Sequence, residues 1–414
     1  MPRDHRFTGI DVGSAYIRVI VASWNTEMDR LVVLGIGEVP SEGVQKGIIT
    51  DVEEATKALG QALDRAERVS GMPVERAYVS INGSHISSQN SRGVIAVSRA
   101  DGEITAEDVS RVINAAQAIS LPNNREILHV LPQDFVVDGQ EHIHDPVGMT
   151  GVRLEVDAHL IEGSAPFIKN LTKIVNQAGV NVEDFVFAPL AAATAILDKR
   201  QRELGVVVME MGAGTTGLVV YEENVLLHTA VLPLGASHIT NDIAIGLRTS
   251  ITAAEEIKRQ YGTSLPQTVK KNEMVTIENY AIPGETETVS RLEVANIINA
   301  RLDEIFTLAD RELNVISRSG LLPAGVVMTG GGASLPGVLE TAKKKLRLPA
   351  RIGKSDALEG ITQDTADPRY AVALGLIFWA QNQESRSPRR VSLTLPDISN
   401  SVSKVKGWLR TLLP

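Results

Sequence analysis

The chain has 414 residues, a net charge of −9, 43% hydrophobic residues and no cysteine. This length exceeds what one hydrophobic core usually supports, so we expect two or more domains. The negative charge argues against nucleic-acid binding over the whole surface, and the absence of cysteine excludes disulfides, thiolate catalysis and Cys-ligated metals. The N-terminus lacks the apolar segment of a signal peptide and no run approaches 18 apolar residues, so the expected compartment is the cytoplasm.

The first residues predict a strand–turn–strand unit that carries an acidic side chain. An apolar strand over 7–12 includes Asp11, the turn contains Gly13 and Ser14, and an apolar strand over 15–22 includes Arg18. A third strand is expected over 30–39. A capping box, Thr50-Asp-Val-Glu53, then opens a helix that runs to about Ser70. Residues 76–81 form the next strand, which ends at the turn 82–84.

Residues 85–162 differ from their surroundings and predict a small α+β unit inserted into the larger domain. The expected elements are strands over 93–98, 127–137 and 152–160 and a helix over 106–119 capped by Thr105. His142 and His144 raise the question of a metal site. Because such a site needs three or four convergent ligands, we expect both to be solvated loop residues.

A second strand–turn–strand unit follows a helix over 165–178, a strand over 182–187 and a proline-initiated helix over 189–197. Its strands are expected over 206–209 and 218–220, and the turn between them runs from Glu210 to Gly217. Glycines let backbone N–H groups approach an anion, threonine hydroxyls add donors, and Glu210 stands where a phosphate-bound Mg²⁺ needs a ligand, directly or through water. An ordinary tight hairpin is the alternative. Two such units half a chain apart favour duplicated lobes that hold one nucleotide between them.

The remaining elements continue the α/β pattern. We expect a strand over 225–234, a turn and helix over 235–247, a capped helix beginning at Thr252, two short strands around 283–284 and a long helix over 292–317. Glu255 and Lys258 lie three residues apart on one helix face and form either a surface ion pair or a clamp for a ribose or adenine edge. A strand over 324–329 leads into Gly330, Gly331 and Gly332, where bare backbone leaves room for a flat ring; Pro336 is placed in the first turn of a helix, and a last helix runs over 368–380.

The C-terminal tail has a different composition from the rest. Residues 382–401 predict a flexible polar linker, and residues 402–414 predict a helix with one apolar face. That face contains Val402, Val405, Trp408, Leu409, Leu412 and Leu413 within an arc of about 140°, flanked by Lys404 on one side and by Lys406 and Arg410 on the other. At about 1.5 Å per residue the helix is too short to span a bilayer, so it would lie on an anionic surface. Docking onto its own globular part or a partner is the alternative.

Taken together, these motifs resemble the actin/Hsp70/sugar-kinase superfamily. Its two phosphate loops resemble Asp11-Val-Gly13-Ser14 with Arg18 and Glu210-Met-Gly212-Ala213-Gly214-Thr215-Thr216, its adenosine loop resembles Gly330-Gly331-Gly332-Ala-Ser334, and its adenosine clamp resembles Glu255 and Lys258. Residues 234–247, the insertion and the tail make the chain similar to the FtsA family of bacterial actin homologues in cell division. The resemblance implies ATP and Mg²⁺ as cofactors, with Asp11 and Glu210 near the metal, through water.

The implied fold is α/β: a two-lobed actin-like ATPase fold with duplicated ribonuclease-H-like lobes, an inserted 1C subdomain and a C-terminal amphipathic helix. The resemblance places subdomain 1A at 1–84, 163–204 and 366–381, subdomain 1C at 85–162, subdomain 2A at 205–235 and 313–365, and subdomain 2B at 236–312. The linker at 382–401 and the membrane helix at 402–414 complete the chain.

Two departures from the superfamily pattern bear on turnover. Glu210 replaces the usual aspartate, and Gly217 stands where relatives carry a second aspartate near the Mg²⁺ hydration shell. Loss of that charge weakens metal positioning and water activation, so we predict at most a slow ATPase.

The implied function is that of a filament-forming adaptor. It would tether the ring of the tubulin homologue FtsZ to the inner face of the cell membrane at the division site and help recruit other divisome proteins. Its implied partners are the C-terminal peptide of FtsZ, held by subdomain 2B, a second copy in a head-to-tail filament, and the anionic membrane surface. Arg301 is a candidate contact for the peptide, and an ordinary exposed helix arginine is the alternative.

Other functions remain possible from the sequence. A pilus-assembly platform of the PilM kind would share the fold and a 1C-like unit, although it is not expected to end in the helix. A sugar-kinase phosphotransferase would need a carboxylate base facing a substrate hydroxyl, for which the chain offers no convincing candidate.

Overall fold

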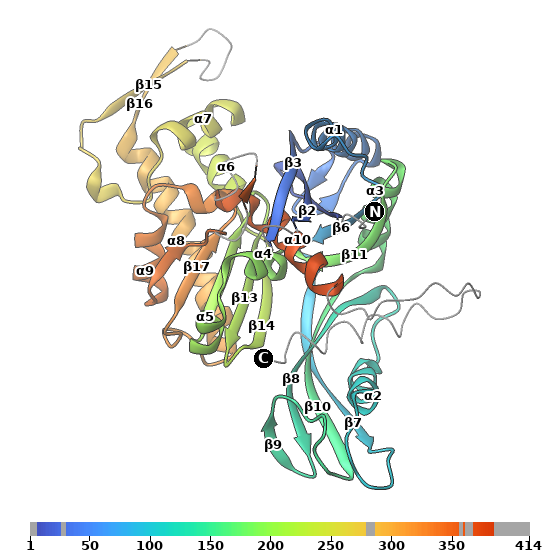
Figure 1. The fold of residues 1–414 in the computed structure, drawn as a ribbon. Helices are drawn as coiled ribbons and strands as arrows, with labels where there is room; N and C mark the ends of the chain where they lie inside the picture. The colour runs from blue at the N-terminus through green and yellow to red at the C-terminus, as the bar shows by residue number, and fades with distance from the viewer. Residues whose placement is uncertain (1–5, 26–29, 279–285, 356–358, 361–366, 385–414) are drawn as a thin grey trace.

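The computed structural model describes residues 6–25, 30–278, 286–355, 359–360 and 367–384. Two sheets with the same connectivity form its two lobes (Figure 1). In the described residues, the lobe 1 sheet has the order β11 (Asn181–Phe187), β6 (Arg76–Ile81), β1 (Arg6–Val12), β2 (Tyr16–Asn25), β3 (Arg30–Pro40) and β19 (Glu359–Gly360). The lobe 2 sheet has the order β18 (Ala350–Ile352), β17 (Gly325–Thr329), β12 (Val206–Met211), β13 (Thr216–Glu222) and β14 (Val225–Leu232).

The pairing directions repeat between the lobes. In lobe 1, β1, β2 and β3 pair antiparallel, whereas β1, β6 and β11 pair parallel. In lobe 2, β12, β13 and β14 pair antiparallel, whereas β12, β17 and β18 pair parallel. The duplication predicted from the two acidic hairpins is therefore confirmed.

The sheets and helices stack in alternating layers. Helices α1 (Val52–Ser70) and α3 (Ala165–Gln177) cover one face of the lobe 1 sheet, and α10 (Ala371–Glu384) covers the other. Between the lobes, α10 packs on α4 (Ala188–Ile196), which is apolar except for Thr194 and therefore suits a largely buried position. On the far side of lobe 2 lie α8 (Arg291–Val315) and α9 (Val338–Leu346).

Alternate side chains of strand β12 belong to two different hydrophobic cores, one on each face of the lobe 2 sheet. Successive side chains of a strand point to opposite faces of the sheet. Accordingly, Val206 and Val208 join the core shared with α4 and lobe 1, whereas Val207, Met209 and Met211 join the core on the α8 side. All five side chains are fully buried, which explains why the strand reads as a continuous apolar run.

The remaining elements connect or extend the lobes. They are β4 (Val44–Gln45) and β5 (Ile48–Ile49) in lobe 1, and in lobe 2 α5 (Lys199–Leu204), α6 (Ala236–Leu247), α7 (Ile251–Tyr261), η1 (Pro266–Thr268), β15 (Met274–Glu278), β16 (Thr286–Ser290) and η2 (Gly331–Ser334). The short helix η4 (Pro368–Tyr370) leads into α10.

The predicted α+β unit forms a separate sheet that projects from lobe 1, and we call it the insert. It comprises β7 (Ser87–Ala96), α2 (Ala106–Gln117), β8 (Arg125–Val137), β9 (Gln140–Ile143) and β10 (Arg153–Ser164), with the strand order β7-β10-β8-β9. It has its own buried core and lies below both lobes in Figure 1. His142 is 89% exposed and His144 is also exposed. Among the described residues, no group of three or more potential ligands could hold a metal ion.

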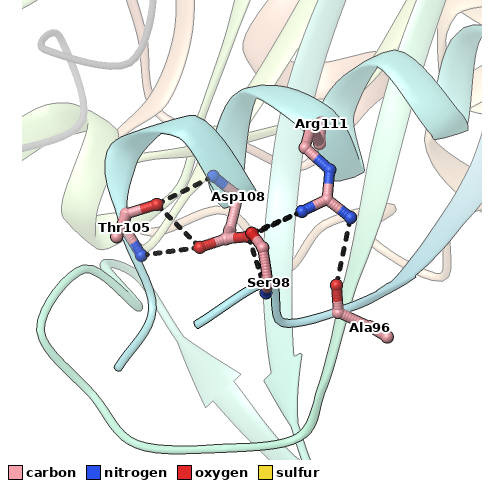
Figure 2. A network of polar contacts seen from close by, with 5 residues as sticks. All are labelled: Ala96, Ser98, Thr105, Asp108 and Arg111. Carbon is pink, nitrogen blue, oxygen red and sulfur yellow. Dashed lines mark hydrogen bonds and ion pairs between the residues drawn. The ribbon is translucent and has the colours of Figure 1, made fainter. Parts of the chain in front are cut away.

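A buried carboxylate fixes the start of α2, as Figure 2 shows. Thr105 caps the helix as predicted, and Asp108 accepts hydrogen bonds from the backbone N–H and hydroxyl of both Thr105 and Ser98. Arg111 adds an ion pair at 2.8 Å. Although burial opposes ionisation, the hydrogen bonds from Ser98 and Thr105 lower the pKa of Asp108 to about 2. The end of β7 and the start of α2 are thereby held together.

Several predicted boundaries are wrong. Helix α1 is capped by Asp51, whose side chain accepts from Glu54 N, and not by Thr50. Ser250, two residues before the expected Thr252, caps α7. Pro336 precedes α9 because η2 takes up the glycine segment first. Helix α10 extends to Glu384, so its last turn occupies the start of the predicted linker.

Candidate functional site

A cavity of about 720 Å³ opens between the two lobes, and both acidic hairpins line it. The first turn, between β1 and β2, closes with a hydrogen bond from Gly13 N to Tyr16 O. The second turn, between β12 and β13, closes with one from Gly212 N to Thr215 O. This turn is shorter than the sequence predicted, because Glu210 belongs to β12 and Gly217 to β13. The hairpins occupy equivalent positions in the duplicated sheets. Their turns face one another, because a Cβ atom at Gly214 would lie 3.2 Å from Ser14 Oγ.

Asp11 and Glu210 occupy matching places near the ends of β1 and β12. Each is less than a tenth exposed. The Ser80 hydroxyl donates to Asp11 Oδ1 at 2.8 Å, and the Asn82 amide of lobe 1 donates to Glu210 Oε2 of lobe 2 at 3.2 Å. The two carboxylates lie close enough across the boundary between the lobes for the charge of Asp11 to act on Glu210.

The charge of this acidic pair is poorly compensated. Burial raises the pKa of Asp11 despite the opposing effects of Arg18 and Ser80. Burial, reinforced by the negative charge of Asp11, raises the pKa of Glu210 to about 8. A bound cation would favour the ionised form of both groups.

The donor set fits a hydrated divalent cation. The described residues supply these two carboxylates but no cluster of three acidic or histidine ligands. Mg²⁺ characteristically takes one or two carboxylates and completes its coordination with water and phosphate oxygens. Asp11 and Glu210 are the residues that would hold it.

Arg18 is the cation closest to this pair. Its guanidinium lies 3.9 Å from Asp11 Oδ2 and forms a 2.6 Å ion pair with Glu38. It also stacks near the rings of Tyr16 and Tyr370. Because Glu38 and the two rings restrain the side chain, Arg18 presents a fixed positive charge to the cavity.

The far end of the cavity is formed by α6, α7 and η2. Lys258 forms the predicted ion pair with Glu255 at 2.6 Å, and its ammonium also donates to Thr240 Oγ1 at 2.7 Å. Of the three glycines, Gly331 faces open space, whereas a side chain at Gly330 or Gly332 would collide with Met211. A planar group could therefore approach bare backbone at Gly331 in the cavity that the Glu255–Lys258 pair also lines.

The cavity brings together nearly all of the residues that the sequence assigned to nucleotide and metal binding. Those that line it are Asp11, Gly13, Ser14, Arg18, Glu210, Gly212, Ala213, Gly214, Thr215, Glu255, Lys258, Gly330, Gly331, Gly332 and Ser334. Thr216 does not line it, because this fully buried residue belongs to β13 and donates its hydroxyl to Leu234 O. Arg301 lies away from the cavity on α8, where Asp242 binds it at 2.5 and 2.8 Å and Glu304 binds it at 2.5 Å. The predicted membrane residues from Val402 to Leu413 lie outside the described residues.

Sequence reasoning missed several polar groups of the cavity. Ser80 and Asn82 contact the two carboxylates from the end of β6, and Asp367 and Arg369 line the wall next to Arg18. A polar residue at or directly after the end of a buried strand was a usable signal for Ser80, within the last two residues of β6, and for Asn82, directly after it, since ligands of α/β sheets bind at the carboxyl ends of strands. Asp367 and Arg369 carry no such signal, because only the fold returns this segment to the cavity.

The described helices include none that combines the length and apolar character needed to cross a bilayer. This finding covers the part of the chain that the structure describes.

Comparisons with solved structures identify the architecture. A PilM-PilN type IV pilus biogenesis complex chain matches with a TM-score of 0.66 at 16% identity, covering 90% of this chain and 98% of that one. MreB 5 of Spiroplasma citri bound to AMPPNP matches with a TM-score of 0.53 at 14% identity, covering 93% and 98%. At these identities the likeness establishes the actin-like fold.

Sequence comparisons establish the family. The model for the SHS2 domain inserted in FtsA matches residues 83–162, and the model for cell division protein FtsA matches residues 207–375. Cell division protein FtsA of Borreliella burgdorferi is 39% identical, with 97% of each chain covered. That of Bacillus subtilis is 37% identical, with 96% of this chain and 88% of the relative covered. The chain belongs to the FtsA family of cell division proteins.

Proposed function

We propose that the interlobe cavity binds ATP with Mg²⁺. The observation that carries this proposal is the convergence of two glycine turns and two buried carboxylates from duplicated sheets on one cavity. The turns provide backbone N–H donors for phosphate oxygens, and the carboxylates suit a hydrated cation. The Glu255–Lys258 pair and the open face of Gly331 would hold the nucleoside. An MreB relative of the same fold was solved with a nucleotide analogue, which supports the assignment.

Calorimetric titration of the full chain with ATP and MgCl₂ tests this proposal directly. Lys258→Ala should weaken nucleotide binding about tenfold or more, because a charge-assisted hydrogen bond contributes about 1.5–3 kcal/mol. Lys345→Ala is the matched control, since that lysine pairs with Asp303 at the surface, away from the cavity. If the unaltered chain shows no heat of binding with any adenine nucleotide, the proposed site is wrong.

We further propose that the protein is an adaptor in bacterial division. It would join FtsZ to the cytoplasmic face of the membrane, assemble head to tail with other copies, and help recruit further divisome proteins. Membership of the FtsA family supports the division role. The apolar and basic pattern of residues 402–414 supports the membrane contact. ATP turnover is expected to be slow at most.

The tail makes a separate prediction. Removing residues 402–414 should abolish sedimentation with vesicles that contain anionic phospholipid, because the apolar face and the basic side chains are lost together. Vesicles of neutral lipid are the control and should retain the full chain much less. Equal sedimentation of the full and shortened chains would show instead that the tail docks elsewhere.

The proposed contact of FtsZ with Arg301 acquires a structural constraint. Asp242 and Glu304 already bind this guanidinium, and its side chain is 22% exposed. An acidic peptide would have to displace one of these carboxylates or share the guanidinium with them. The neighbouring helices α6 and α8 would then form the floor of the peptide site.

A further inference from the structure

The insert belongs to lobe 1 by chain connectivity, yet its sheet also contacts lobe 2. The amide of Gln133 on β8 donates to the carbonyl oxygens of Leu226 and Leu227 on β14, at 2.8 and 3.1 Å. The hydroxyl of Ser88 on β7 donates to Thr229 O at 2.9 Å. Since β14 is the outer strand of the lobe 2 sheet, these side chains satisfy carbonyl groups at its edge.

The centre of this contact is buried. His159 on β10 is 2% exposed and lies between Asn90 Oδ1, 2.7 Å from Nδ1, and Thr229 Oγ1, 2.9 Å from Nε2. Leu131 and Ile161 of the insert share one buried cluster with Leu226 of β14. The insert and β14 therefore form a buried interface in which directional hydrogen bonds are shielded from water.

At the root of its strands the insert is bonded to lobe 1, where Phe187 N of β11 donates to His129 Nε2 of β8 at 3.0 Å. Arg125 at the start of β8 forms a 3.1 Å ion pair with Glu162 near the end of β10. Ser87 at the start of β7 donates to the same carboxylate at 2.9 Å. One buried carboxylate thus ties the three strands to one another at their root, and the bond from Phe187 joins them to the lobe 1 sheet.

Strand β14 connects this contact to the cavity. Its residues Leu226, Leu227 and Thr229 carry the carbonyls that the insert binds, and its end leads through Gly235 into α6. There Ala236 N donates to Gly212 O at 2.9 Å, and the Ser237 hydroxyl donates to Ala213 O at 2.6 Å. The segment that directly follows β14 is therefore hydrogen-bonded to the second glycine turn, while β14 itself is hydrogen-bonded to the insert.

Two sets of contacts to lobe 2 form together in this arrangement of the lobes, one at the cavity and one at the insert. At the cavity, Asn82 of lobe 1 bonds Glu210 of lobe 2, and the missing side chain of Gly214 lets Lys46 Cα approach the turn. Hydrogen bonds of 2.8–3.1 Å weaken when the partners move apart, and repulsion resists movement together. A rotation between the lobes that displaces β14 from the insert would therefore disturb these bonds.

We propose that the insert is an interlobe strap, and that Ser88, Gln133 and His159 are positioning residues that hold the cavity in its binding geometry from a distance. The role in ligand affinity rests on the proposed function, whereas the mechanical role does not. By linkage, a ligand that requires this arrangement of the lobes should stabilise the contact between the insert and β14. Conversely, a partner that separates the insert from β14 should weaken ligand binding.

The double variant Ser88→Ala/Gln133→Ala tests the strap, because it removes three hydrogen bonds by truncating side chains that are only partly buried. We expect ATP–Mg²⁺ affinity, measured calorimetrically, to fall about fivefold, and nucleotide release to become correspondingly faster. Gln140→Ala is the matched control, because Gln140 is exposed on β9 of the same sheet. Its affinity should equal that of the unaltered chain.

Hydrogen exchange without nucleotide provides the second measurement. The double variant should exchange faster than the Gln140→Ala control both in β14 and in the turn from Gly212 to Thr215. If the unaltered chain binds no nucleotide but the variant shows this exchange, the proposed function fails and the strap stands. If the variant matches the control in exchange at the turn, or matches it in measurable affinity, the strap is wrong.

Discussion

Replacing Gly217 with aspartate should destabilise the protein severely and should not create an extra metal-binding carboxylate. Gly217 pairs directly with Glu210 across the second hairpin. A Cβ atom at this position would lie 2.1 Å from Cγ of Pro189, in the first turn of the buried helix α4. Because α4 is packed between the two lobes, it has little room to shift. We expect a loss of about 3 kcal/mol or more, from overpacking and the burial of an unpaired charge.

Thermal unfolding of the Gly217→Asp variant measures this effect, and phosphate release measures any gain in turnover. Gly331→Ala is the structural control, because a Cβ there meets no atom within 4 Å. It should unfold close to the unaltered protein. A Gly217→Asp protein with an unchanged Tm and faster phosphate release would show that α4 yields and that the missing carboxylate alone limits hydrolysis.

The environment of Gly217 shows how much the sequence alone reveals about turnover. The departure at Gly217 was visible in the sequence, and the lost charge near the metal was its expected consequence. The structure adds a reason for the residue that no local pattern contains: Pro189, far from it in the chain, occupies the space of its side chain. The sequence identifies the departure, and the packing of α4 explains why we expect aspartate at this position to destabilise the protein.

The fold was predictable to the extent that its signals are local and repeated. The two hairpins that carry Asp11 and Glu210 are short-range patterns, and their repetition led to duplicated lobes. The same holds for Glu255 and Lys258, because helical spacing alone places them together. Thr105 as a cap was also correct, whereas the choice of Thr50 over Asp51 failed because both are good caps and tertiary packing decides between them.

Contacts between distant segments were not predictable. The approach of Asn82 to Glu210 depends on how the lobes face one another, and the contact of Gln133 with β14 depends on where the insert projects. Arg301 shows the same limit. Its residue type fits an acidic peptide, but its pairing with Asp242 on α6 follows only from the packing of α6 against α8. A single sequence therefore predicts the helices and strands more clearly than it predicts which of them contact one another.

Glu210→Gln should stabilise the protein without ligand and metal while it weakens Mg²⁺-dependent nucleotide binding. The pKa of Glu210 rises from 4.5 to about 8 through burial and the nearby charge of Asp11. Between these values the folded protein keeps a proton that the unfolded chain has released. The unfolding free energy therefore falls as pH rises from about 4.5 to 8. Glutamine has nearly the same shape and does not ionise, so the variant escapes this loss.

Calorimetric Tm values across pH 4–9 test the sign. The variant and the unaltered chain should unfold alike near pH 4, and the advantage of the variant should grow to on the order of 2–4 kcal/mol by pH 8. Asp11 titrates together with Glu210, so the difference reports on the pair. Glu340→Gln, at an exposed site on α9, should show no such trend. A Tm difference that does not change between pH 5 and 8.5 would mean that Glu210 is already compensated in the ligand-free protein. In that case an uncompensated charge at Glu210 would not destabilise the ligand-free protein, and the argument that this site requires a bound cation would fail.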